Sequence, residues 1–203
     1  MRIMPIVVVA ALPLIFFLEI VSADFTKGQD AYNSGDYQTA ISEWQPLADE
    51  GNAEGQFGMG LIYGNGFGVD LNDDLALKWY GAAAEQGHAD AQCNLAVMHA
   101  NGWGVPQSDK AAFDWYSLAA EQGVTEAQIA VAKMYSSGFG AQQNNVMAHK
   151  WFAIASAMGD YDANFKRDML SERMSPEEIA DSGALAAAWM ENHQSLLAKD
   201  LRH

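Results

Sequence analysis

Histidines are the side chains most able to hold a metal ion or transfer protons near neutral pH, and this 203-residue chain has five. They are His88, His99, His149, His193 and His203. No two of them stand four residues apart, and none lies in an H-E-x-x-H sequence, which would place two ligands and a glutamate on one helix. We therefore predict no metal site and no cofactor.

The nucleophilic and acidic side chains also lack a catalytic setting. No serine occurs in a G-x-S-x-G sequence, which would expose its hydroxyl at a strand-to-helix turn. Cys93 is the only cysteine and has no disulfide partner within the chain. The acidic pairs Asp73/Asp74 and Glu177/Glu178 stand at expected helix starts, where the helix dipole favours negative charge. We predict that the protein is not an enzyme.

One glycine-rich segment, Gly64-Asn65-Gly66-Phe67-Gly68, has the composition of a phosphate-binding loop but not its context. No strand is expected before it and no Lys-Ser/Thr pair follows it. The same glycines recur as Gly102/Gly104 and Gly138/Gly140, so turn geometry explains them. We expect the aromatic residue between each pair to pack against the adjacent unit, the alternative being a contact at the rim of a groove; these residues are Phe67, Trp103 and Phe139.

The same interval of 36 residues organises the rest of the chain. Columns with this spacing are Gly51/Gly87/Gly123/Gly159, Ala40/Ala76/Ala112/Ala148, Gln56/Gln92/Gln128 and Trp79/Trp115/Trp151. Self-similarity at a fixed period of this size is typical of a solenoid, in which each unit buries its apolar face by stacking on its neighbours.

Each unit predicts two helices joined by the glycine loop. In the first complete unit, Gly55, Met59, Ile62 and Tyr63 form the inward-facing stripe of the first helix. The second helix is expected to begin at a capping residue, Asn72, Ser108 or Asn144, and to end near a glycine such as Gly87 or Gly123. The fold class is therefore an all-α solenoid of stacked antiparallel helix pairs. Cys93 shares a column with Phe57 and Ile129, which indicates a structural apolar position.

The three units resemble Sel-one-like repeats, a branch of the tetratricopeptide repeat superfamily. The strings are GLIYGNGFGVDLNDDLALKWYGAAAEQG, VMHANGWGVPQSDKAAFDWYSLAAEQG and KMYSSGFGAQQNNVMAHKWFAIASAMG. Departures are mild: His99 takes a tyrosine position, and Ala141 stands where Val69 and Val105 do. We assign residues 52–172 to the repeat array, and residues 24–51, which are similar to the centre of a tetratricopeptide unit, to an N-terminal capping unit.

The C-terminal segment, residues 173–203, is expected to form a capping helix. Ser175, Pro176 and Glu178 make up a helix start with a capping box. An apolar side follows, with Ile179, Leu185, Ala186, Trp189 and Leu196, and we expect it to cover Phe165, Met169 and Leu170. The alternative is an amphipathic helix that binds another molecule. We also expect His149 to face solvent, because it stands beside Lys150.

Residues 1–23 do not belong to the repeat and are typical of a secretory signal peptide. Arg2 precedes an apolar run from Ile3 to Val21, and Val21-Ser22-Ala23 offers small residues for cleavage before Asp24. Export to a periplasm or secretion is the expectation. The alternative is an uncleaved membrane anchor, because a run of 19 residues is close to the length of a membrane span.

Charge limits the partners. The chain has 11 Lys and Arg residues and 26 Asp and Glu residues, and the resulting net charge of -15 repels phosphate backbones. Nucleic-acid binding is therefore not expected. A protein or peptide partner with basic side chains suits this charge, and a membrane partner is expected only if the N-terminal segment is retained.

The Sel-one-like resemblance implies binding on the concave side, which first helices line in the superfamily. On these helices, the positions opposite the inward stripe form an apolar column beside an acidic one, a trough for a peptide. The predicted partner-binding residues are Glu54, Phe57, Leu61, Asn65, Asp90, Cys93, Val97, Asn101, Glu126, Ile129, Lys133 and Ser137. The alternative is that these columns merely contact the neighbouring repeat.

We therefore predict an exported, non-catalytic scaffold or adaptor. One alternative is a cell-wall or β-lactam-active hydrolase, because some secreted proteins of this family are described as hydrolases. Those relatives are rich in disulfides, and a chain with one cysteine departs from them. Another alternative is a component of an envelope machine for polysaccharide export or cell-wall growth.

Overall fold

The computed structural model describes residues 25–194, and the predicted signal segment and Leu196 lie outside this range. All regular secondary structure in the described range is helical, which confirms the predicted class. A helix over residues 25–34 is followed by α2 (Tyr37–Asp49), α3 (Ala53–Asn65), α4 (Asp73–Glu85), α5 (Ala89–Asn101), α6 (Asp109–Glu121), α7 (Thr125–Ser137), α8 (Asn145–Ala157), α9 (Tyr161–Ser171) and α10 (Pro176–Asn192).

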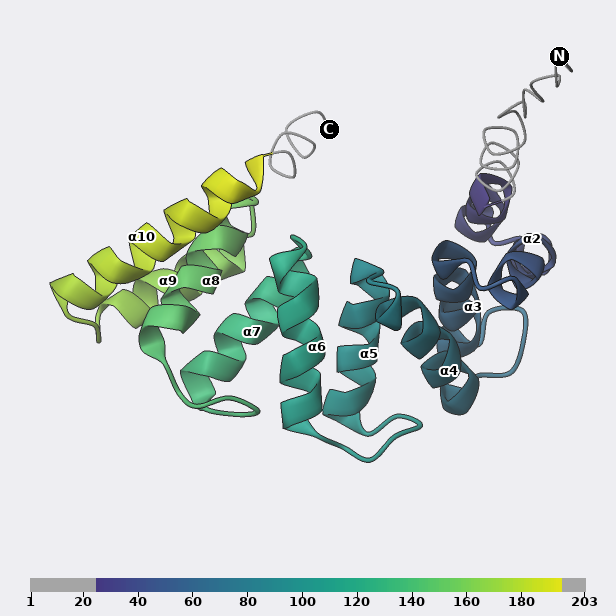
Figure 1. Ribbon diagram of the computed structural model, residues 1–203, viewed down its shortest axis with the longest axis horizontal. Coiled ribbons are helices and arrows are strands. Elements are labelled where there is room, and N and C mark those ends of the chain that lie inside the picture. The colour runs from purple at the N-terminus through teal and green to yellow at the C-terminus, as the bar shows by residue number, and fades with distance from the viewer. Residues whose placement is uncertain (1–24, 195–203) are drawn as a thin grey trace, which may run out of the picture.

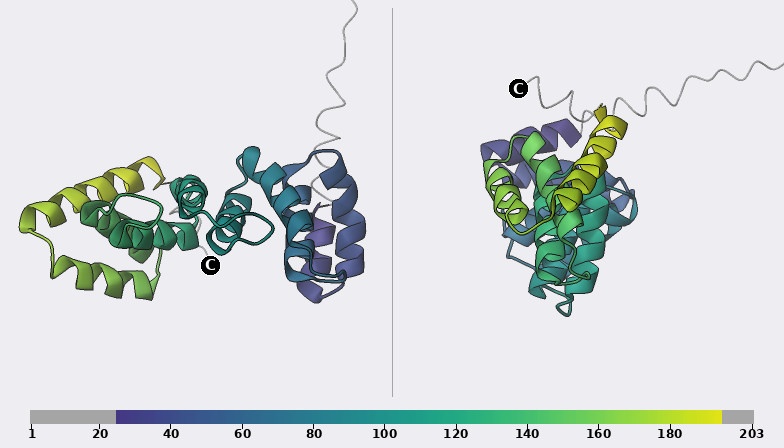
Figure 2. Two further views of the ribbon diagram at one scale, coloured as in Figure 1. Left: turned by 90° about the horizontal axis from the view of Figure 1, so that it is seen from below. Right: turned by 90° about the vertical axis from the view of Figure 1, so that its left-hand side faces the viewer.

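The helices stack in chain order into an elongated solenoid (Figure 1). From α3 to α8, each helix packs mainly against the helices before and after it in the chain, as α3 does against α2 and α4, whereas α10 packs against α8. The view from below shows the stack extended along one direction, and the view from one end looks along it, so that the helices overlap (Figure 2). Stability of such a molecule comes from contacts within each hairpin and between neighbouring hairpins.

Helix ends follow the predicted pattern. The side chains of Asn72, Ser108 and Asn144 each accept a hydrogen bond from a backbone amide three residues further on, as N-caps do. Gly87 and Gly123 have φ of 89° and 94°, a left-handed conformation that a residue with a side chain rarely adopts. Among the first helices, Asn52 and His88 cap α3 and α5 with their side chains, whereas Val124 at the equivalent position before α7 makes no side-chain cap bond.

Glutamine side chains tie successive units together. Gln56, Gln92 and Gln128 are buried, and the amide nitrogen of each donates to a backbone oxygen near the end of the preceding helix. The amide nitrogen of Gln86 donates to the side-chain oxygen of Gln56 at 2.7 Å, and that of Gln122 donates to Gln92 at 2.8 Å. One buried amide therefore joins three consecutive helices.

This hydrogen-bond series stops at α7. Met158 stands 36 residues after Gln122, so the side-chain oxygen of Gln128 receives no donor and is buried without a hydrogen bond among the described residues. A buried polar atom without a partner costs about 1–3 kcal/mol, so the last complete repeat carries a local loss of stability.

The C-terminal helix caps the stack in a way that differs from the prediction. Its capping box at Ser175 and Glu178 is present. However, α10 packs against α8, and Phe165 and Met169 on α9 remain 58% and 48% exposed, while Leu170 is buried. Leu185 is also exposed, so the prediction that it belongs to the apolar side is wrong.

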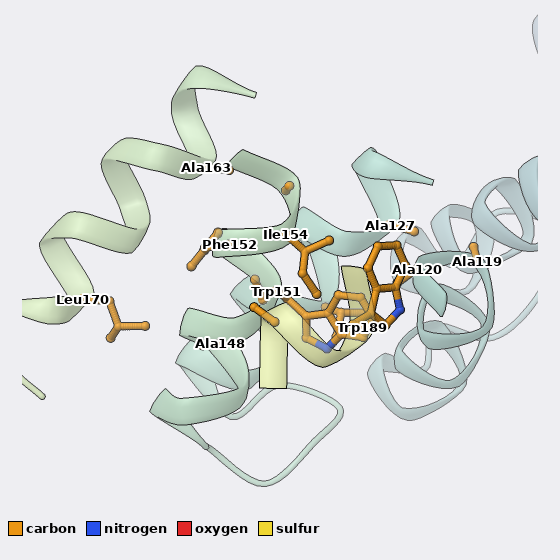
Figure 3. Packing of buried hydrophobic residues seen from close by; sticks show 14 of the residues in the cluster. Ala119, Ala120, Ala127, Ala148, Trp151, Phe152, Ile154, Ala163, Leu170 and Trp189 are labelled. Atoms are coloured by element: carbon orange, nitrogen blue, oxygen red, sulfur yellow. The ribbon is translucent and has the colours of Figure 1, made fainter. Parts of the chain in front are cut away.

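The reason lies in what α10 contacts. Trp189 packs against Trp151 of α8, with ring centroids 6.0 Å apart (Figure 3), and its indole nitrogen donates to Glu121 at the end of α6. In addition, α9 carries Asp168 where earlier first helices have Gly60, Ala96 and Ala132. A charged side chain at that position prevents a second helix from approaching α9 as α4 approaches α3.

His149 is buried, with 6% exposure, so the prediction that it faces solvent is wrong. Its Nε2 lies 2.9 Å from the Ser171 hydroxyl and its Nδ1 lies 2.8 Å from the Ser182 hydroxyl. Burial and the nearby Arg167 lower its pKa, against a smaller raising effect of Asp168. His149 therefore joins α8 to α9 and α10.

Replacing Met158 with glutamine should extend the glutamine series by one unit. The new amide would donate to the Gln128 oxygen. We therefore expect the free energy of unfolding of the variant to be about 1 kcal/mol higher than that of the native protein. Urea denaturation followed by circular dichroism measures this. The control is Met158→Leu; a Gln variant no more stable than the Leu variant would contradict the prediction.

Candidate functional site

Three hollows follow one another along the first helices of the hairpins. The first, of about 250 Å³, is lined by Leu61, Gly64, Asn65, Asp73, Ala76, Tyr80, Asn94, Val97, Met98 and Trp103. The second, of about 650 Å³, is lined by Ala100, Gln107, Asp109, Tyr116, Glu126, Ile129, Ala130, Lys133, Met134 and Phe139. The third, of about 220 Å³, is lined by Lys133, Ser136, Phe152, Lys166, Met169, Leu170 and Arg173.

The hollows are the same feature repeated. Tyr80, Tyr116 and Phe152 stand 36 residues apart, and one of them lies in each hollow. Several other lining positions recur after two such intervals: Leu61 of the first hollow corresponds to Lys133 of the third, and Val97 to Met169. Each hollow lies between two successive first helices, with an aromatic residue of the intervening second helix among its lining. The repeat itself therefore produces a series of sites at equivalent positions.

The glycine loops place an aromatic residue in two hollows. Gly104 has a φ of 65°, and a Cβ there would lie 2.8 Å from the backbone oxygen of Asp73, so only glycine lets the loop approach α4. The loop then holds Trp103 in the first hollow, and Phe139 is placed likewise in the second. These rings are 50% and 66% exposed.

Of the three loop aromatics, one packs against the adjacent unit and two are accessible at the rim of a hollow. Phe67 stacks on Tyr37, with ring centroids 4.6 Å apart, and so packs on the preceding unit as expected. The residues equivalent to Tyr37 in the next units are Asp73 and Asp109, which offer no ring. Trp103 and Phe139 therefore remain accessible, as the rim alternative requires.

Half of the predicted binding residues line these hollows: Leu61, Asn65, Val97, Glu126, Ile129 and Lys133. Asn65 also donates a hydrogen bond to the Leu61 backbone oxygen at 2.9 Å, so it closes its own helix. The binding role of these residues stays a prediction.

The remaining predicted residues are not in the lining of the hollows: Glu54, Phe57, Asp90, Cys93, Asn101 and Ser137. Phe57 stacks on His88 of the next unit at a centroid distance of 4.4 Å, and Glu54 lies 3.1 Å from the same imidazole. Cys93 packs against the C-terminal core cluster. Asn101 and Ser137 bond backbone oxygens of their own helices. Part of the predicted trough therefore contacts neighbouring repeats.

The charge of the hollows changes along the stack. The first has Asp73 as its only charged lining residue, the second has Asp109, Glu126 and Lys133, and the third has Lys133, Lys166 and Arg173. Of the cations that line the third hollow, Lys133 was among the predicted binding residues, whereas Lys166 and Arg173 were not. A further shift of 36 residues along the predicted column Asn65, Asn101 and Ser137 reaches Arg173. Lys166 corresponds to Asn94 and Ala130, which were not predicted to bind, so no sequence signal indicated it.

The described residues contain no group of three His, Cys, Asp or Glu side chains placed to hold a metal ion. In the same part of the chain, no helix is both long and apolar enough to cross a membrane. The hollows offer carboxylates, cations and exposed rings, which suit recognition of another chain.

Comparison with known proteins agrees with the geometry. A family model described as Sel1 repeat matches residues 53–88, 89–124 and 125–160, more than half of the chain. The chain belongs to the Sel1 repeat family. The boundaries of these Sel1 matches coincide with the 36-residue period of the helical hairpins.

Two solved structures are similar. A Sel1 repeat protein from Oxalobacter formigenes has 32% sequence identity and a TM-score of 0.67, over 70% of this chain and 58% of that one. The protective antigen c5321 of uropathogenic Escherichia coli, which displays an SLR fold, has 23% identity and a TM-score of 0.54, over 90% of this chain and 48% of that one. The chain thus spans about half the length of these relatives. No curated protein matches it significantly.

Cys93 should behave as a packing residue. Burial raises the pKa of its thiol to about 12, and the nearby Glu126 and Asp90 carboxylates add to the rise. Because the thiolate is the reactive form, we expect very slow labelling by a disulfide reagent at pH 8 in the native protein and fast labelling in urea. Labelling of the native protein as fast as in urea would contradict this.

Proposed function

We propose that this Sel1 repeat protein is a non-catalytic scaffold that binds a segment of a partner protein along the three hollows. The supporting observation is their recurrence at one position of successive repeats, because a row of equivalent positions suits an extended or helical peptide that is bound at regular intervals. Interaction repeats commonly use such continuous surfaces.

The first two hollows suit basic and apolar side chains. Trp103 with Asp73, and Phe139 with Asp109, each place an exposed ring and a carboxylate in one hollow. Lysine and arginine side chains can pack their methylene groups on a ring while the charge reaches a carboxylate. The strong acidity of the chain would also speed association with such a partner.

Photo-crosslinking in intact cells tests this proposal. A benzophenone amino acid placed at position 103 or 139 should crosslink to one defined protein. The same group at position 118 should not, because Leu118 is also exposed but lines none of the three hollows.

The crosslinked protein, once purified, allows a direct measurement. We expect the double variant Trp103→Ala/Phe139→Ala to lose at least tenfold in affinity by calorimetry, since exposed aromatic residues at such positions often carry more than 1 kcal/mol each. The control variant Leu118→Ala should bind like the native protein. Equal affinity for all three proteins would exclude the hollows as the binding surface.

We further propose that the protein is exported to a periplasm or secreted, with residues 1–23 removed as a signal peptide. The support is the run from Ile3 to Val21 and the small residues before Asp24. Mature protein from a fractionated cell should begin at Asp24. Recovery from the membrane fraction with the first 23 residues intact would favour the anchored alternative.

A further inference from the structure

The third hollow differs from the other two in its charge. Its lining combines three cations, Lys133, Lys166 and Arg173, with the hydroxyl-bearing Ser136 and an apolar floor of Phe152, Met169 and Leu170. No carboxylate lines it, whereas the first hollow contains Asp73 and the second contains Asp109 and Glu126. The contrast is marked in a chain whose net charge is -15.

Two of these cations are available to a ligand. Lys166 forms an ion pair with Asp162 on its own helix. Within residues 25–194, no carboxylate lies within ion-pair distance of Lys133 or Arg173. The pKa of Asp162 is lowered mainly by its hydrogen bond with Lys166, and the more distant charge of Lys133 adds a small lowering effect. The hollow therefore holds an excess of positive charge that its own lining does not neutralise.

We infer that the third hollow binds an acidic side chain, a glutamate or aspartate, of the segment that occupies the groove. Both parts of the lining contribute. The methylene groups of a glutamate would cover the floor formed by Phe152 and Met169, and its carboxylate would reach the guanidinium of Arg173 and the ammonium of Lys133. Arginine binds carboxylates through two parallel hydrogen bonds, which favours this class of ligand.

This inference rests on the proposed function and extends it. A partner with basic side chains in the first two hollows and an acidic one in the third can lie in the groove in one direction only. The volume of about 220 Å³ limits the third subsite to about one side chain, because sites for drug-sized ligands begin near 300 Å³. Charge order along the partner would thus determine its register.

Nuclear magnetic resonance of methionine methyl groups tests the subsite without the partner. Met169 lies in the hollow, and its signal is assigned from the Met169→Leu variant. The probes are N-acetylglutamate α-amide, its glutamine counterpart and N-acetylleucine with a free carboxylate, titrated at constant ionic strength. We expect the glutamate probe alone to shift the Met169 signal in a saturable way.

Charge variants provide the control. Arg173→Gln should weaken binding of the glutamate probe at least threefold, whereas Lys110→Gln, which removes an exposed cation outside the hollows, should leave it unchanged. Equal shifts from the glutamine probe, or equal effects of the two variants, would overturn the inference. A larger shift from N-acetylleucine would assign the hollow to a chain terminus instead. These results are independent of the crosslinking experiment, so each proposal fails on its own evidence.

Discussion

Burial between successive hairpins is the interaction on which this molecule depends. A single pair of helices, such as α3 and α4, leaves Met59 and Ile62 with too few neighbours, and the preceding unit completes their burial. The contacts that hold this geometry are specific: Gly58 brings α3 against Trp44, and Gln56 bonds the helix end before it and the helix end after it. Because Gln92 repeats the bonds of Gln56 in the next unit, and Gln128 repeats the one to the preceding helix, these units stack in one register.

That register also creates the surface. Successive first helices are separated by a second-helix aromatic, Tyr80, Tyr116 or Phe152, and the space above each ring is a hollow. Some lining residues belong to the buried core, as Tyr80 and Phe152 do, but the charged ones do not, so the charge of the lining can vary while the fold persists. Asp73, Lys133 and Arg173 show such variation, with negative charge in the first hollow and positive charge in the third.

The periodic part of the molecule was predictable from the sequence, since a shift of 36 residues aligns caps, stripes and loop glycines. The aperiodic part was not. Asp168 and the contact of Trp189 with Glu121 direct α10 onto α8. The spacing of apolar residues along a helix does not predict either of them. Helical periodicity also placed Phe57 and Leu61 together on one exposed face. The turn toward the next repeat instead places His88 against Phe57. Contacts between units, which a single helix cannot reveal, decide these cases.

Deletion of one complete repeat tests the central claim that equivalent units stack through equivalent contacts. Removing residues 89–124 joins His88 to Thr125 in register, whereas removing residues 89–118 breaks the register. We predict that the first protein keeps its helical signal per residue and melts cooperatively at a lower temperature. The second protein should lose helical signal and should not melt cooperatively. Loss of helical signal in the in-register deletion would contradict the claim.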